Sequence, residues 1–191
     1  MSGDTDSVTD VFVYDRLSDA IERVSVNASG TEGNGGSDEP AISADGRHVA
    51  FQSAATNLVS GDTNGTNDVF IYHRQTSAIE RVSVDASGTE GNGESRYPSI
   101  SADSRYVAFE STAANLVSGD TNSVTDVFVY DRLAGATERV SVDESGTEVY
   151  NVSASPSISA DGRYVAFESF ATNLVSGDTN GVKDIFATPV Q

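Results

Sequence analysis

A strict 58-residue repeat runs through the whole 191-residue chain. The tetrapeptide Ser-Gly-Asp-Thr recurs at this interval, and it begins at Ser2, Ser60, Ser118 and Ser176. The segment Glu-Arg-Val-Ser-Val keeps the same interval, and so does the segment Ser-Ala-Asp-Gly-Arg, whose middle copy has Ser in place of Gly. No insertion changes the spacing. The chain is therefore predicted to fold into identical units that pack on identical neighbours.

Each unit is predicted to hold four short strands. The strands of the middle unit are expected at Pro98–Ser101, Tyr106–Ser111, Asp126–Asp131 and Thr137–Val142. These segments are rich in Val, Ile, Phe and Tyr, which suit a half-buried pleated surface. The Ala-Asp-Gly and Leu-Ala-Gly segments between them are typical of hairpin turns. No segment keeps a 3.6-residue apolar period long enough to predict a substantial helix.

Four-stranded antiparallel units in tandem are typical of an all-β fold, the β-propeller. A β-sandwich does not need identical repeats, and a β-solenoid has a shorter coil. The units are expected as a partial blade at 1–39, blades at 40–97 and 98–155, and a partial closing blade at 156–191. This division predicts 13 strands, or about three blades in a single propeller domain.

The repeat resembles a known family. Its pattern is Pro-x-Ile-Ser-Ala-Asp-Gly-Arg-x-Val-Ala-Phe, then Asn-Leu-Val-x-Gly-Asp-Thr-Asn-Gly-x-x-Asp-Val-Phe-Val-Tyr-Asp-Arg, carried most fully by residues 40–84 and 98–142. This pattern resembles the TolB-type (WD-like) β-propeller repeat of bacterial proteins. The resemblance implies a propeller used for protein–protein interaction, with six blades in TolB itself. It also implies a secreted or periplasmic protein, although this chain has no signal peptide.

Three blades do not close a ring, and open sheet edges favour pairing with another chain. The N-terminal hairpin is suited to complete a blade begun by the C-terminal strands, either of the same chain or of a partner. We expect a homodimer that closes one six-bladed ring. The alternatives are a piece of a longer array and a monomer with frayed ends. The last segment, 184–191, leaves the repeat after Phe186 and contains Pro189, so we expect a true C-terminus. Segments 184–191 and 11–15 both fit one strand position in the closing blade. The sequence does not indicate which of them occupies it.

The loop before the third strand of each unit is the strongest candidate site. It carries acidic or amide side chains at offsets 0, 2 and 6 in all four copies. These are Asp4, Asp6 and Asp10; Asp62, Asn64 and Asp68; Asp120, Asn122 and Asp126; and Asp178, Asn180 and Asp184. Such oxygen ligands suit Ca²⁺, and the spacing resembles the start of an EF-hand loop without its final bidentate Glu.

The same loop has a second interpretation. Asp and Asn also form ordinary Asx turns, and a repeat copies its turns together with its strands. The net charge of the chain is −18, and bound cations would reduce the repulsion among its negative charges. This favours the calcium interpretation. Calcium sites and plain turns both remain open at this point.

The composition excludes several classes of function. The acidic charge argues against partners made of nucleic acid and against anionic membrane surfaces, and no apolar run is long enough to span a bilayer. The chain has no Cys and only two His, which leaves little for thiol or histidine catalysis. We therefore expect a non-enzymatic binding or scaffold module for a protein or glycan ligand. The alternatives are a carbohydrate-active hydrolase or lyase with acidic residues at the propeller mouth, and a purely architectural ring.

Two further sets of repeated residues are assigned structural roles. Phe and Tyr recur on the second and third strands, and we expect them to pack between neighbouring blades. Arg and Asp recur at the end of the third strand, and Arg recurs on the fourth. We expect these residues to form ion pairs between strands or between blades, each contributing about 0–1 kcal/mol where exposed.

Overall fold

The computed structural model describes residue 5 and residues 7–191, and within them the fold is all-β, as predicted. The described residues form 13 strands. These are β1 (Phe12–Asp15), β2 (Ala20–Arg23), β3 (Ser37–Ile42), β4 (His48–Ser53), β5 (Asp68–His73), β6 (Ala78–Arg81), β7 (Ser95–Ile100), β8 (Tyr106–Ser111), β9 (Asp126–Asp131), β10 (Ala136–Arg139), β11 (Ser153–Ile158), β12 (Tyr164–Ser169) and β13 (Asp184–Pro189). This part of the chain holds no helix that is long and apolar enough to cross a membrane.

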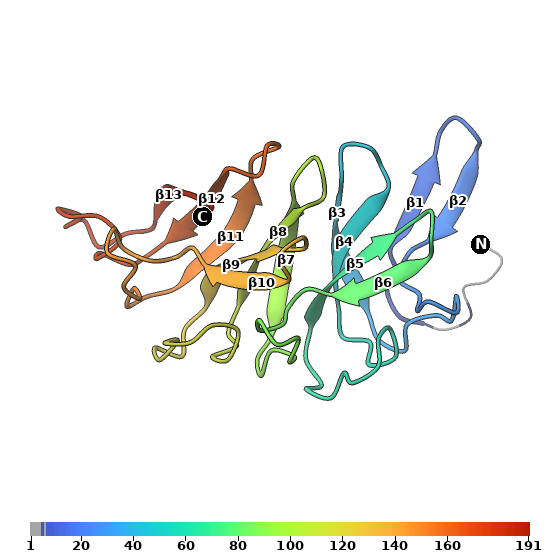
Figure 1. Cartoon of the computed structure of the whole chain (residues 1–191), viewed down its shortest axis with the longest axis horizontal. Coiled ribbons are helices and arrows are strands. Elements are labelled where there is room, and N and C mark those ends of the chain that lie inside the picture. Colours follow the sequence, from blue (N-terminus) through green and yellow to red (C-terminus); the bar gives the residue numbers. More distant parts are fainter. Residues whose placement is uncertain (1–4, 6) are drawn as a thin grey trace.

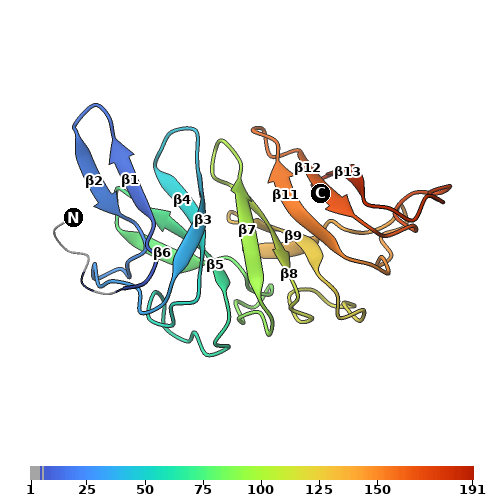
Figure 2. The ribbon, with the colours of Figure 1, turned by 180° about the vertical axis from the view of Figure 1, so that it is seen from behind.

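The strands form a row of four antiparallel sheets (Figures 1 and 2). Two sheets are complete, with the orders β3-β4-β5-β6 and β7-β8-β9-β10. The first sheet holds only β1 and β2, and the last holds only β11, β12 and β13. Figure 1 shows the first sheet, with β1 and β2, and the last sheet, with β11 to β13, at opposite ends of this row. The sheets are the blades of a partial β-propeller.

Two strand boundaries of the middle blade differ from the prediction by more than one residue. The first strand of the middle blade begins at Ser95 rather than Pro98, because a register shift between Arg96 and Ser99 lets the ladder pass through Tyr97, whose φ is 49°. The last strand ends at Arg139 rather than Val142. Beyond it the Ser141 hydroxyl oxygen accepts from the backbone N–H of Val127 at 3.1 Å and donates to an Asp126 carboxylate oxygen at 2.6 Å, so a side chain replaces a backbone carbonyl in the ladder.

Where two neighbouring blades meet, an aliphatic face of the earlier blade packs against an aromatic face of the later one. The face of the second blade with Val69 and Ile71 lies against the face of the third blade with Phe109 and Phe128, in one buried cluster. Phe109 and Phe128 are fully buried, with ring centroids 5.9 Å apart. Equivalent clusters join the first blade to the second and the third to the fourth. These contacts confirm that the repeated aromatic residues pack between blades.

Ion pairs also join neighbouring blades, although not all of them have the expected partners. Arg74 on the second blade donates to Glu22 on the first at 2.7 Å, and Arg132 on the third donates to Glu80 on the second at 2.5 Å. Asp131, at the end of the third strand, pairs with Arg105, the residue before strand β8, rather than with Arg139 across its hairpin.

The two end blades each leave one face uncovered. Ile185 on β13 is 74% exposed, whereas the equivalent Val127 is 0% exposed. Tyr14 on β1 is 54% exposed, whereas the equivalent Tyr72 is 4% exposed. In this structure β13 pairs with β12 along its whole length, and so it takes the third-strand position of the last blade.

Candidate functional site: carboxylate clusters with a central arginine

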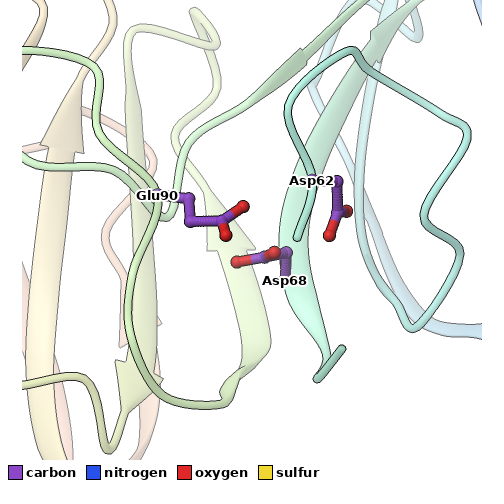
Figure 3. A group of neighbouring side chains, drawn as sticks. All are labelled: Asp62, Asp68 and Glu90. Carbon is purple, nitrogen blue, oxygen red and sulfur yellow. The ribbon is translucent and has the colours of Figure 1, made fainter. Parts of the chain in front are cut away.

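Three carboxylates meet at one end of the second blade. Asp62 lies in the loop before β5, Asp68 is the first residue of β5, and Glu90 follows β6. One oxygen from each lies within 4.8 Å of the others, and Figure 3 shows the three side chains turned toward one another. The third blade repeats the cluster 58 residues later with Asp120, Asp126 and Glu148.

A network of short hydrogen bonds fixes Asp68 at the centre of its cluster. Its side chain is 0% exposed. One carboxylate oxygen accepts from the Ser83 hydroxyl at 2.6 Å, and the other accepts from the Asn64 side-chain amide at 3.0 Å. The Asn64 side-chain oxygen accepts from the backbone N–H of Thr66 at 2.9 Å, which is an Asx turn. The turn interpretation of this loop is therefore correct for Asn64.

An arginine lies within each cluster. Nη1 of Arg81 is 2.7 Å from Glu90, 3.2 Å from Asp68 and 3.6 Å from Asp62. Its Nη2 donates to the carbonyl of Gly61 at 3.1 Å. The side chain of Arg81 is only 8% exposed, so this guanidinium is a buried cation among three carboxylates. It is held by strong, charge-assisted hydrogen bonds.

The third blade holds the same arrangement. Nη1 of Arg139 is 2.8 Å from Glu148 and 3.5 Å from both Asp120 and Asp126. In the first blade, Arg23 pairs with Asp10 at 3.1 Å and with Glu32. The same polar network is thus present in three successive blades.

Burial and mutual repulsion raise the pKa of some acids of these clusters, and hydrogen bonds lower the pKa of others. Burial, together with the charge of Asp68, raises the pKa of Asp62 to about 6, and the equivalent effects raise the pKa of Asp120 to about 6. Burial acts to raise the pKa of Glu148 as well. There, hydrogen bonds from the backbone and hydroxyl of Thr121 and from Arg139 outweigh it and lower the pKa to about 2. Each cluster therefore combines a firmly ionised Glu with an Asp that takes up a proton easily.

The predicted calcium ligands are placed differently in different copies. Asp62, Asp68, Asp120 and Asp126 come together in the clusters, whereas Asn64 and Asn122 present amide N–H groups to the neighbouring Asp. Asp10 lies beside Arg23, and Asp4 and Asp6 lie outside the described residues. In the fourth copy Asn180 donates to Asp184 at 2.9 Å, and the Asp178 carboxylate accepts from the Asn180 backbone N–H at 3.3 Å.

The donor set of the second and third blades suits a guanidinium better than a calcium ion. Calcium takes six to eight oxygen ligands, whereas here an arginine lies among the carboxylates and an amide N–H group faces one of them. An ion would have to displace Arg81 or Arg139. Calcium binding therefore stays a prediction. Competition from an arginine is least at the loop of the fourth copy, residues 178–184.

Sequence reasoning missed the Glu of each cluster, and it assigned the Arg to ion pairs between strands or between blades without placing it at this loop. Both come from the fourth strand and the turn that follows it, more than ten residues from the Asp-containing loop. A signal was present, because Arg23, Arg81 and Arg139 and also Glu32, Glu90 and Glu148 keep the 58-residue interval. Only the pairing of the third strand with the fourth shows that they meet the loop.

The fold and these repeated clusters define a section of a β-propeller. Comparison with solved structures identifies the propeller type. TolB from Acinetobacter baumannii has a TM-score of 0.51 at 20% identity, over 94% of this chain and 38% of that one. A putative TolB from Agrobacterium tumefaciens also has a TM-score of 0.51, at 15% identity, over 88% of this chain and 53% of that one.

A lyase has a similar fold. Oligogalacturonate lyase from Vibrio parahaemolyticus has a TM-score of 0.50 at 12% identity, over 94% of this chain and 41% of that one. No family model matches the sequence, and no curated protein matches it. The chain thus has the TolB-like β-propeller fold that its repeat predicted, and it spans about half or less of the length of these similar proteins.

Proposed function

We propose that the chain is a non-enzymatic binding or scaffold module, a section of a TolB-like propeller that presents its loops to a protein or glycan ligand. The observation that carries this proposal is the symmetry of the carboxylate clusters. The two three-acid clusters found in the described residues are copies of each other, and an arginine lies in each. A catalytic centre needs different residues at equivalent positions, whereas a scaffold repeats the same ones.

A repeated surface groove supports a binding role. One groove lies between the turn at Asp85–Ser87 and the loop 114–119, with a volume of about 690 Å³. The equivalent groove lies between Asp143–Ser145 and residues 172–177, with a volume of about 350 Å³. Polar side chains and backbone line both. A ligand with its own repeat, such as a glycan, would meet the same groups in successive blades.

A glycan array probed with the labelled chain tests this proposal. We expect binding to a subset of glycans that weakens when Ser87→Arg or Ser145→Arg narrows one groove. Arg47→Gln, on a turn of the second blade outside either groove, is the matched control. A chain that binds no glycan, and binds no peptide on a parallel peptide array, would refute the proposal.

The enzymatic alternative has its own test. A hydrolase or lyase would release reducing ends or unsaturated products from a polysaccharide panel that includes oligogalacturonates. If such activity appears and is lost in Asp62→Asn or Asp120→Asn, the acids with raised pKa act as catalysts and the scaffold proposal fails. We further propose an exported location, which the TolB resemblance implies, and fractionation of native cells would test it.

A further inference from the structure

One series of backbone hydrogen bonds between neighbouring blades, at the turn after the first strand, has its donor on the earlier blade and its acceptor on the later one. The N–H of Ala44 donates to the carbonyl of Ala102 at 3.2 Å, and the N–H of Ala102 donates to the carbonyl of Ala160 at 2.9 Å. Within the described chain, the N–H of Ala160 and the carbonyl of Ala44 have no equivalent partner. One end of the row thus presents a donor, and the other end presents the matching acceptor.

The apolar faces at the two ends are complementary in the same way. The last blade exposes the aliphatic face of Ile185 and Ala187, and the equivalent faces of the inner blades are covered by an aromatic face. The first blade exposes Tyr14 of its aromatic face. Ile42 on β3 is 51% exposed, whereas the equivalent Ile158 is 8% exposed, because the first blade lacks the two strands that would cover it.

The repeated ion pair between blades gives the most specific observation. An Arg after the third strand of one blade binds the Glu 52 residues earlier, as Arg74 binds Glu22 and Arg132 binds Glu80. Glu138 is the next Glu of this series, but Val190 stands where its Arg is expected, and only the backbone N–H of Gln191 donates to Glu138. Burial raises the pKa of this carboxyl.

Arg16 is the opposite half of that pair. It is equivalent to Arg74 and Arg132, and it is exposed with no ion pair to any residue that the structure describes. Strand β1 precedes Arg16 in the sequence and strand β2 follows it. The two strands form a hairpin that corresponds to the third and fourth strands of a blade. The hairpin also carries its own Asp10–Arg23–Glu32 cluster.

Strand β13 is a weak occupant of the third-strand position. None of its residues is buried, whereas the first four residues of β9 are all buried. It ends on Pro189, which has no N–H to donate to a ladder. The fourth strand that would cover it is absent from the last sheet. A hairpin with its own cluster would pair better with the same edge of β12.

We propose that two copies of this chain assemble head to tail, with the β1–β2 hairpin of each copy pairing with β12 of the other in the position that β13 occupies here. Arg16 of one copy then meets Glu138 of the other, as Arg132 meets Glu80 within the chain. Each copy contributes two complete blades and half of each of the two blades that the copies share. The closed ring has six, a number within the usual range for propellers. Closure by a two-fold axis covers both ends of both copies.

A reversible lock on β13 tests the exchange. Ala166 on β12 and Ala187 on β13 lie directly opposite each other, a separation that a disulfide can bridge. The natural chain has no Cys, so Ala166→Cys with Ala187→Cys introduces the only thiols. By light scattering after gel filtration, we expect a dimer for the reduced variant and a monomer after oxidation. A dimer that survives oxidation overturns the strand exchange.

A charge swap tests the proposed contact between copies. Arg16→Glu and Glu138→Arg each place two like charges together, and each is expected to weaken dimerisation about tenfold or more. The two changes combined in one chain restore the pair and should restore most of the affinity. Arg105→Glu, which makes the same change in charge on the central blade, should leave the affinity unchanged.

Two results overturn the proposal. One is a wild-type chain that stays monomeric throughout the micromolar range. The other is a double variant that dimerises no better than the weaker single variant. Neither result bears on ligand binding by the surface grooves, so the array experiment can fail or succeed independently of the assembly.

Discussion

Removal of the arginine from one cluster tests whether these sites are structural ion networks. In Arg81→Gln three carboxylates face one another without their cation. Breaking a buried ion pair by removing one partner costs about 3–5 kcal/mol. The side chain of Arg81 is 8% exposed and lies 2.7 to 3.6 Å from its three partners, so we expect a loss of free energy of unfolding in that range. This is a third or more of a typical total on the order of 10 kcal/mol.

The pH dependence of this loss separates charge from packing. At about pH 8 the three carboxylates are ionised and repel one another, whereas at about pH 5 Asp62, whose pKa is already raised to about 6, takes up a proton. We therefore expect a smaller loss at the lower pH. Urea unfolding followed by circular dichroism at both pH values measures it. Arg47→Gln is the control, because Arg47 is 56% exposed and pairs with Asp45 at 3.7 Å. Its loss should be about 0–1 kcal/mol.

Calcium adds a further comparison in the same experiment. Loss of the guanidinium frees oxygen ligands that a cation can bind, so millimolar Ca²⁺ should stabilise Arg81→Gln more than it stabilises the wild type. Equal stabilisation of both proteins would place a calcium site elsewhere, as at the loop from Asp178 to Asp184. If Arg81→Gln lost less than about 1 kcal/mol, or lost the same amount at both pH values, the reasoning about a buried ion network would be wrong.

Two smaller perturbations extend the same reasoning. Ser83→Ala removes the hydroxyl that donates to buried Asp68 at 2.6 Å. In urea unfolding it should lower the free energy of unfolding by about 1–3 kcal/mol. The control, exposed Ser87→Ala, should lower it by about 0.5 kcal/mol or less. The raised pKa values of Asp62 and Asp120 mean that the folded state binds their protons more tightly than the unfolded one, so the stability that these two acids contribute should decline as the pH rises from 3.8 through about 6. Thermal melts across that window measure the decline, and it should be smaller in Asp62→Asn.

The repeat predicted most of the fold because period and alternation are local signals. The pairing of Phe109 with Phe128 follows from two apolar strands that alternate in the same register on either side of a loop. The start of β7 could not be predicted in this way. The ladder there passes through the positive φ of Tyr97, a backbone conformation to which a residue pattern gives no clue.

The candidate site was only half predictable for a related reason. Asp62 lies in the loop before β5 and Asp68 begins β5 only six residues later, so their spacing shows that they lie near each other. Arg81 and Glu90 reach them only through the pairing of β5 with β6 and the turn that follows. The direction of the Asn64 amide group depends on its Asx turn, and residue type alone could not distinguish an oxygen ligand from an N–H donor.

The clearest departures from the repeat in the last blade lie where the proposed assembly needs them. An inner blade must fit two identical neighbours, so a change in a contact residue disrupts an interface. Val190 in place of Arg removes the cation that would bind Glu138 from within the chain, and Pro189 weakens the ladder at the same strand end. Both changes reduce the hold of β13 on the last blade and leave the Glu138 carboxylate available. Because Arg16 is exposed and has no ion pair to any residue that the structure describes, the two changes together favour closure by a second copy over closure by β13.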